Sequence, residues 1–252
     1  MLRVRVMPCL LLRQSKLVKT VKFENPDYIG DPINAVKIYN DKEVDELIFL
    51  DITATVEKKD PPFKIISEIA SECFMPYTYG GGIHSLEDMR RIFNLGVEKI
   101  AINSQAVESP DFIRRAAKEF GNQSIVASID VKRKLIGKYE VFTKSGTNPT
   151  GLGPVEHAKR MEEMGAGEIL LTSIDRDGTW EGYDLDLIKT VAEAVNVPLI
   201  VCGGAGSIED FRKAVDAGAS ACAAGSMVVY QAKNRGVLIN FPKQTELRTV
   251  LP

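Results

Sequence analysis

MPYTYGGGIHSLEDMRRIFNLGVEKIAINS, residues 75–104, recurs in altered form as VPLIVCGGAGSIEDFRKAVDAGASACAAGS at residues 197–226. The offset between the two copies is constant at 122 residues, so that Gly82 aligns with Gly204 and Ser104 aligns with Ser226. A repeat of about half the chain length that occurs only twice is not typical of a solenoid. It predicts two half-domains that share one core.

Short apolar runs alternate with segments of helical periodicity along the whole chain. The runs that have the composition of buried strands are residues 4–12, 46–52, 77–79, 99–102, 124–129, 169–173, 199–202 and 221–224. The helical segments are residues 32–42, 62–73, 85–95, 110–120, 154–164, 185–195 and 207–217. This alternation predicts a parallel sheet covered by helices, and eight units in 252 residues fit a closed (β/α)8 TIM barrel. A doubly wound open sheet is the alternative, but a twofold repeat closes naturally into a ring.

Helix ends support the same reading. Ser85 and Ser207 are each followed by two acids, a capping pattern, and Gly96 and Gly218 follow the two helices as stop signals. Because no linker interrupts the pattern, we expect one domain over residues 1–252, with half-barrels of about 1–122 and 123–252. Two additional segments, residues 18–30 and 132–151, follow strands, so both are expected at the face where barrel active sites are built.

Composition excludes several classes of protein. The content of 44% hydrophobic and 26% charged residues is that of an ordinary globular protein, and the formal net charge of −2 gives no reason to expect nucleic acid or an anionic membrane as partner. No run of 18 apolar residues exists, so no membrane span is expected. The four cysteines have no metal-binding spacing, which predicts reduced thiols, a cytoplasmic protein and no metal or cofactor.

Glycines at strand ends indicate anion binding. Residues 80–82 and 203–204 are glycines that end the third and seventh strands, where backbone N–H groups can approach a phosphate. The following strands finish with Asn103-Ser104 and Gly225-Ser226. Since the halves repeat, the sequence predicts two phosphate sites across one barrel mouth.

Six motifs, taken together, resemble a known family over essentially the full chain. They are FLDIT at 49–53, GGGI at 80–83, INS at 102–104, SIDVK at 128–132, SIDRDGT at 173–179 and CGGAG at 202–206. The chain is similar to the cyclase subunit of imidazole glycerol phosphate synthase (HisF), a lyase/cyclase of histidine biosynthesis. The resemblance implies a barrel whose substrate carries a phosphate at each end. It also implies a HisH-like glutamine amidotransferase that docks on the N-terminal barrel face and supplies ammonia.

The same resemblance implies roles for single residues. The positions that would contact substrate or its phosphates are Lys19, Gly82, Asn103, Ser104, Asp177, Gly178, Gly204, Gly225 and Ser226. The family uses two catalytic aspartates as general acid and base, of which Asp130 is the second. The first falls in a Pro-Cys-Leu-Asp motif, where this chain has Leu11. Because Leu11 cannot transfer a proton, we expect cyclase activity to be severely impaired.

Charged residues begin four of the expected strands: Arg5, Glu46, Lys99 and Glu168. In a parallel barrel the strand starts meet at the N-terminal mouth, where two cations and two anions can pair with each other. A structural plug of salt bridges is one interpretation. By resemblance these four positions are the gate through which ammonia enters, and all four are kept although the catalytic aspartate is not.

Other polar residues have simpler interpretations. His84 and His157 lack a partner pattern and are expected at solvent-exposed helical positions. Asp51 ends the second strand and faces the mouth, where it either orients a ligand or has no role.

The leading functional expectation is a HisF-like subunit that helps to deliver ammonia to an N-acetamido sugar nucleotide in surface-polysaccharide biosynthesis, forming an acetamidino group. It would work with an amidotransferase and an ATP-dependent amidation partner, as the cyclase-like barrels that it resembles do. The first alternative is a working cyclase subunit in which Asp51 or a water replaces the missing aspartate. The second alternative is a non-catalytic scaffold that conducts ammonia and activates its partner.

Overall fold

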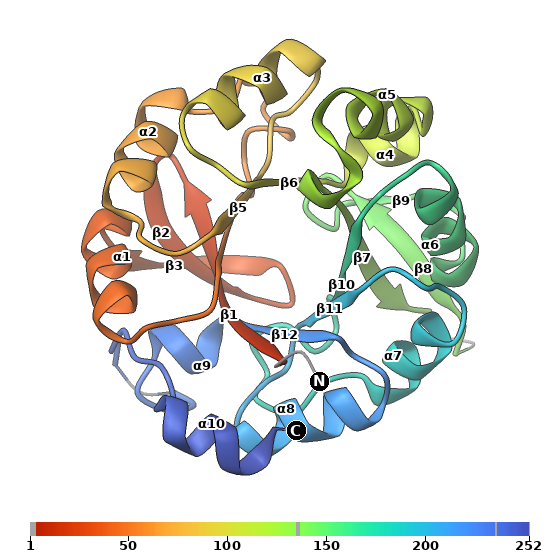
Figure 1. Cartoon of the computed structure of the whole chain (residues 1–252). Coiled ribbons are helices and arrows are strands. Elements are labelled where there is room, and N and C mark those ends of the chain that lie inside the picture. The colour runs from red at the N-terminus through yellow and green to blue at the C-terminus, as the bar shows by residue number, and fades with distance from the viewer. Residues whose placement is uncertain (1–3, 135–136, 235, 252) are drawn as a thin grey trace.

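The computed structural model describes residues 4–134, 137–234 and 236–251. In these parts of the chain eight parallel strands close into a ring (Figure 1). In ring order they are β1 (Arg5–Arg13), β4 (Leu47–Asp51), β5 (Tyr77–Gly80), β6 (Lys99–Ile102), β7 (Ile125–Arg133), β10 (Glu168–Ser173), β11 (Leu199–Cys202) and β12 (Ala221–Ala224). Pairing of β6 with β7 and of β12 with β1 joins the two halves. Together with the pairing of β7 with β10, these pairs close the ring and confirm the (β/α)8 barrel.

The alternation of side chains along each strand divides the apolar residues into two clusters. On β1, Val6, Leu10 and Leu12 point outward and pack under the helices. Met7 and Cys9 point inward, into a cluster that fills the barrel interior. We call this cluster the apolar bore; it consists of Met7, Cys9, Ile48, Ala101, Val126, Leu170, Ile200, Cys202, Ala221 and Ala223.

All seven expected helices are present, and they surround the ring (Figure 1). They are α1 (Pro32–Asp41), α2 (Phe63–Glu72), α3 (Leu86–Asn94), α5 (Asp111–Phe120), α6 (Pro154–Glu163), α7 (Leu185–Ala192) and α8 (Ile208–Asp216). The sequence pattern did not indicate α4 (Ser104–Glu108), α9 (Ser226–Val229) and α10 (Gln244–Val250). Helices of four to seven residues are too short to show a clear period.

The expected caps are formed in both copies of the repeat. The Asp88 amide donates to Ser85 Oγ over 3.0 Å, and the Ser85 amide donates to Asp88 Oδ2 over 2.9 Å. In the second copy the Ser207 amide donates to Asp210 Oδ2 over 3.0 Å. Gly96 and Gly218 follow their helices with φ of +101° and +110°, which is the left-handed region that glycine adopts most easily.

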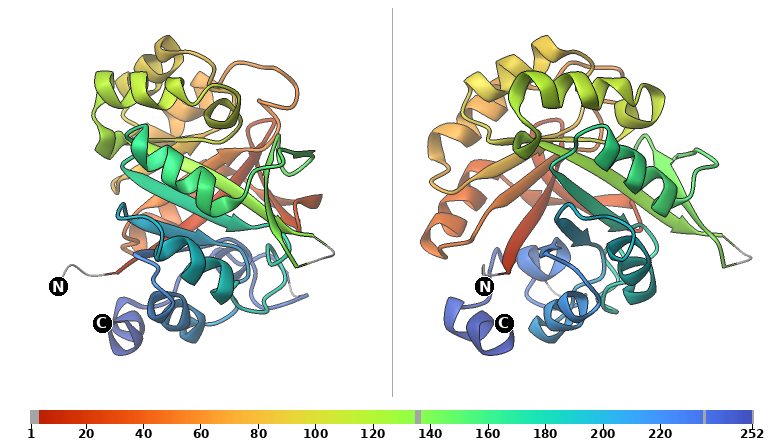
Figure 2. Two further views of the ribbon diagram at one scale, coloured as in Figure 1. Left: turned by 90° about the vertical axis from the view of Figure 1, so that its right-hand side faces the viewer. Right: turned by 45° about the vertical axis from the view of Figure 1, so that its right-hand side comes forward.

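Two hairpins extend from the carboxyl ends of strands. The first, which the sequence indicated only as a loop, consists of β2 (Lys16–Val21) and β3 (Glu24–Gly30), with β2 antiparallel to β1. The second begins with β7, which is longer than expected because it continues to Arg133 and pairs with β8 (Tyr139–Thr143). A short β9 (Asn148–Pro149) follows it. Figure 2 shows both hairpins at the end of the barrel opposite to the start of β1.

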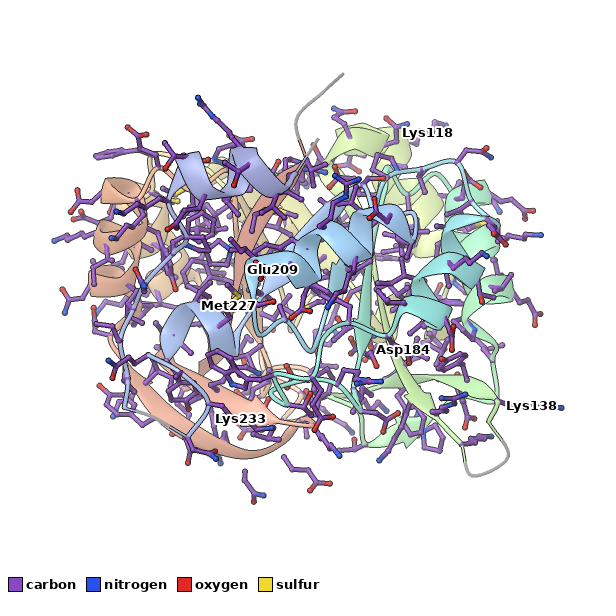
Figure 3. All side chains as sticks on the ribbon, turned by 90° about the horizontal axis from the view of Figure 1, so that it is seen from below. Lys118, Lys138, Asp184, Glu209, Met227 and Lys233 are labelled. Atoms are coloured by element: carbon purple, nitrogen blue, oxygen red, sulfur yellow. The ribbon has the colours of Figure 1, made fainter. Side chains whose placement is uncertain are left out.

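The helices return antiparallel to the strands, so each end of the barrel has a distinct set of loops. In Figure 3, Lys138 of the second hairpin and Lys233 of the segment after α9 lie at one end of the molecule, and Lys118 of the last turn of α5 lies at the other. The strand ends that carry the glycine motifs therefore open on the hairpin side.

The prediction that His157 is solvent-exposed is wrong. The residue is 2% exposed and lies on the inner face of α6, beside Ala158 and Met161. Neither ring nitrogen has a hydrogen-bond partner among the described residues. Burial, and after it the charge of Arg160, lowers the pKa of His157 to about 4. His84 is exposed, as expected.

No helix among the described residues combines the length and the apolar character needed to cross a membrane. These residues also contain no group of three or more His, Cys, Asp or Glu side chains able to hold a metal ion. All four cysteines are free thiols, and Cys9, Cys202 and Cys222 are buried.

Candidate active site

A pocket opens at the carboxyl ends of the barrel strands, beneath the two hairpins. Its empty volume, which includes space open to solvent, is about 1140 Å³. We call it the mouth pocket. The expected site residues that line it are Lys19, Gly82, Asn103, Ser104, Asp130, Asp177 and Gly225. Residues of both halves of the chain and of the first hairpin therefore converge on one space.

Lys19 and Asp177 form a buried ion pair at the pocket wall. Lys19 Nζ lies 2.8 Å from Asp177 Oδ1 and 3.0 Å from Oδ2, and Thr20 Oγ1 donates to Oδ2 over 3.1 Å. The two residues are only 5% and 7% exposed, so each charge needs the other. The Lys22 amide also donates to the Asp177 carbonyl over 2.9 Å. These bonds fasten the β2–β3 hairpin to the loop that follows β10.

Asp130 lies on β7 and is accessible only in part, through the mouth pocket. Asn103 Nδ2 donates to its Oδ2 over 3.3 Å. Enclosure by protein raises the pKa of Asp130 to about 7, with a further increase from the charge of Asp177 and an opposing hydrogen bond from Thr172. A carboxyl group with this pKa can both donate and accept a proton near neutral pH, as general acid–base catalysis requires.

Gly82, Asn103 and Ser104 form the part of the pocket contributed by the first half-barrel. Gly82 has φ of +70°, and a Cβ atom there would lie 2.9 Å from the Lys59 carbonyl oxygen, so glycine is required. Its amide donates to Thr55 Oγ1 over 3.1 Å. Ser104 Oγ accepts from the Lys144 amide, which connects this region to the second hairpin.

The second half-barrel contributes less to the pocket. Gly178, Gly204 and Ser226 are not among its lining residues. A Cβ atom on Gly178 would lie 2.7 Å from the Thr20 carbonyl oxygen, and one on Gly204 would lie 2.1 Å from that of Gly182. Neighbouring backbone thus occupies the space beside these glycines, and the two expected phosphate sites are not equivalent in this conformation.

Leu11 lies on the pocket side of β1, in line with Met7 and Cys9. It is 9% exposed, and its neighbours in register are Leu50 on β4 and Val18 on β2. The position at which the family's first catalytic aspartate is expected is therefore part of an apolar surface.

Asp51 is a second carboxylate in the pocket. Its Oδ1 accepts hydrogen bonds from the Thr53 amide and hydroxyl, both over 2.8 Å, and from the Ala54 amide over 2.9 Å. These three donors fix its orientation at the end of β4. No hydrogen bond to its Oδ2 is present among the described residues.

Thr172 and Cys202 are pocket residues that the sequence interpretation missed. Thr172 is the register neighbour of Asp130 on β10, and its only signal in the sequence was a polar residue near the end of an apolar run. Cys202 was expected to be a core thiol; it is buried, but it also contacts the pocket beside Cys9.

At the opposite end of the barrel, Arg5, Glu46, Lys99 and Glu168 form a closed ring of ion pairs, which we call the charged ring. Arg5 binds Glu46 Oε1 over 2.6 Å through Nη1 and Glu168 Oε1 over 2.7 Å through Nη2. Lys99 Nζ completes the ring at 3.2 Å from Glu46 and 3.1 Å from Glu168. The apolar bore lies between this ring and the mouth pocket, since Cys9, Ala101 and Cys202 belong to the bore and line the pocket.

Comparisons with known proteins show the family to which the chain belongs. The family profile described as "Histidine biosynthesis protein" (His_biosynth) matches residues 5–234. The chain is 51% identical over 248 residues to "Putative imidazole glycerol phosphate synthase subunit hisF2" of Pseudomonas aeruginosa, covering 98% of this chain and 99% of that protein. It is 48% identical to "Putative imidazole glycerol phosphate synthase subunit HisF" of Leptospira interrogans, with 98% of each chain covered. It is 45% identical to "Imidazole glycerol phosphate synthase subunit HisF" of Alkaliphilus metalliredigens, covering 91% and 92% of the two chains.

Proposed function

Because this chain belongs to the family of the imidazole glycerol phosphate synthase subunit HisF, we propose that it is an ammonia-using barrel subunit that amidates a sugar nucleotide instead of closing an imidazole ring. The substrate would be an N-acetamido sugar nucleotide of surface-glycan biosynthesis, and the product would carry an acetamidino group. The observation that carries this proposal is Leu11, which occupies the pocket position where the resemblance expects a catalytic aspartate.

The charged ring and the apolar bore support ammonia delivery. The ring lies at the N-terminal mouth, and the apolar side chains of the bore lie between it and the mouth pocket. The names of the relatives describe them as subunits of a synthase. A HisH-like glutamine amidotransferase docked over the ring would release ammonia into the bore. We therefore assign the ring residues to the partner side of the protein and the pocket residues to the substrate side.

The polar pocket residues support an anionic substrate. Gly82, Asn103 and Ser104 would bind phosphate oxygens on the first-half side, and Lys19 would help when the hairpin opens. On the other side, Asp177 and Gly225 line the pocket and would contact a second phosphate. Gly178, Gly204 and Ser226 do not line it, and Gly178 would become accessible only if the hairpin moved away from it.

The proposed chemistry replaces an oxygen atom by a nitrogen atom. A partner enzyme would use ATP to transfer a phosphoryl or adenylyl group to the oxygen of the acetamido group. Ammonia would then form a bond to the acyl carbon, and the activated oxygen would leave as phosphate or AMP. The attacking nitrogen loses a proton in this step, and the Asp130 carboxylate would accept it.

One assay tests the proposal against the cyclase alternative. The purified protein is supplied with the ribonucleotide substrate of histidine biosynthesis and excess ammonium salt. We expect turnover about 10²–10⁴-fold below that of an ordinary cyclase, because one proton-transfer group is missing. Leu11→Asp should raise this turnover. Normal turnover by the unmodified protein would contradict amidation as the main function.

The cyclase alternative keeps one observation in its favour, since Asp51 is oriented by three donors at the pocket. If Asp51 supplies the missing function, Asp51→Asn abolishes cyclase turnover. Asp130→Asn distinguishes a catalytic barrel from a non-catalytic scaffold. If partner-dependent amidation is unchanged in this variant, the barrel does no chemistry and the scaffold alternative is correct.

A further inference from the structure

The mouth pocket has one apolar and one polar side at the level where the bore reaches it. Cys9, Leu11, Leu50 and Ala101 form the apolar side, which we call the apolar wall. These residues come from β1, β4 and β6. Ser128 and Asp130 on β7, with Thr172 on β10, form the polar side. A ligand that fills this level must therefore have two chemically different faces.

The apolar wall discriminates against polar ligand groups. Leu11 and Leu50 are register neighbours, and neither side chain can donate or accept a hydrogen bond. A hydroxyl or charged group pressed against them would lose its hydration without compensation. A methyl group would gain from the same contact, since burial of apolar surface is favourable. The wall thus favours a ligand with a methyl or similar group at this level.

The position of the wall relates this group to the reaction. Cys9 and Ala101 belong to the apolar bore, and Leu50 packs against it, so the wall borders the end of the bore. A methyl group there brings the carbon bonded to it to the place where ammonia, delivered through the bore as proposed above, would enter the pocket. The remaining oxygen and nitrogen of an acylamino group then face the polar side.

We propose that Leu11 determines substrate specificity by holding the methyl group of the acetamido substituent against the apolar wall, with the acyl carbon over the end of the bore. This inference rests on the proposed function and adds the part of the substrate that the pocket selects. In this arrangement Leu11 takes no part in proton transfer. It replaces a catalytic group by a surface that positions the reacting carbon.

The contact between Leu11 and the methyl group is tested by measuring how two ligands bind to wild type and to two single variants. Binding of UDP-N-acetylglucosamine and of its N-formyl analogue, which lacks only the methyl group, is measured by calorimetry on the full chain. UDP serves as the ligand without sugar. The proteins are wild type, Leu11→Ala and Val21→Ala; Val21 is 51% exposed and is not a pocket residue. Circular dichroism checks that each variant is folded.

We expect wild type and Val21→Ala to prefer the acetyl ligand by roughly 10-fold to 200-fold, the usual value of one apolar carbon in a pocket. Leu11→Ala should lose most of this preference and should bind the formyl ligand almost as wild type does. Equal affinity of wild type for both ligands, or an unchanged preference in Leu11→Ala, overturns the role of Leu11 and leaves sugar amidation standing. If neither sugar nucleotide binds better than UDP to wild type, sugar amidation itself is contradicted, and this inference with it.

Discussion

At the scale of single residues, Asp130 carries the clearest pH dependence. Its surroundings raise its pKa to about 7 in the folded protein, whereas an aspartate in an unfolded chain has a pKa of about 3.9. Between these two values the folded state retains a proton that the unfolded state has released. The contribution of Asp130 therefore makes the protein less stable as the pH rises from about 4 to about 7.

Asp130→Asn should remove this contribution. We expect the variant to be more stable than wild type by an amount that grows from pH 4 to pH 7 and reaches about 4 kcal/mol at most. Urea unfolding at several pH values measures the difference. Asp60→Asn, at an exposed loop position, is the control and should show no such trend. A constant difference across the pH range would mean that the Asp130 carboxyl is not enclosed.

His157 should have the opposite pH dependence. Its pKa is lowered to about 4 in the folded state, against about 6.5 when unfolded, so its neutral form stabilises the fold above pH 6.5. This stability is lost as the pH falls through the window from 6.5 to 4, by up to about 3 kcal/mol.

His157→Leu should abolish the loss, because leucine neither binds a proton nor leaves a buried nitrogen without a partner. Comparison of unfolding free energies at pH 7.5 and pH 5 checks this prediction. His84→Leu alters an exposed imidazole and should behave as wild type. The burial of His157 was visible in the sequence: Pro154, His157, Ala158 and Met161 have the spacing of one helical face.

At the scale of elements, the β2–β3 hairpin is held by the Lys19–Asp177 pair. Lys19→Met leaves the Asp177 carboxylate buried, and the Thr20 hydroxyl is then its one side-chain donor among the described residues. We expect a loss of about 3–5 kcal/mol, as for other broken buried pairs, and faster tryptic cleavage after Lys22. The double variant Lys19→Met/Asp177→Leu should recover part of the stability.

Lys16→Met is the matched control for this prediction. Lys16 lies on the same strand but is exposed, so its replacement should change neither stability nor cleavage after Lys22 by much. If Lys19→Met resembled this control, the hairpin would be held by other bonds, such as those from the Thr20 hydroxyl and the Lys22 amide to Asp177.

The elements themselves were largely predictable because apolar periodicity is a local property. The strands and helices of the repeat, and the caps at Ser85 and Ser207, were confirmed. The first hairpin was not recognised as strands, since β3 has only Ile29 buried and so lacks an apolar alternation.

At the scale of the whole molecule, the closed ring predicts a single cooperative unit. The first and second halves are joined by the pairs β1–β12 and β6–β7, so neither half can unfold without exposing two strand edges of the other. We expect one urea transition in which far-UV circular dichroism and the fluorescence of Trp180, the sole tryptophan, coincide. Two separated transitions would show that the half-barrels fold independently.

The arrangement of the site could be predicted only in part, because it depends on contacts between distant segments. Strand-end motifs indicated that Asn103, Asp130 and Gly225 belong to one mouth, and the structure brings them together. The starts of four strands correctly indicated a ring in which opposite charges pair. That Lys19 pairs with Asp177, 158 residues away, could not be read from either local motif.

The apolar bore has a consequence for the chemical form of nitrogen that the proposed delivery would require. Its ten side chains include no charged group, and Ala101, Ala221 and Ala223 are the smallest of them. An ammonium ion entering this space would give up its hydration shell and find no anion in return, at a cost of several kcal/mol. The free-energy cost of entering this space is far smaller for neutral ammonia. The barrel interior is therefore a barrier to ions, and in the proposed function the nitrogen would have to cross it as neutral ammonia, with its lone pair free.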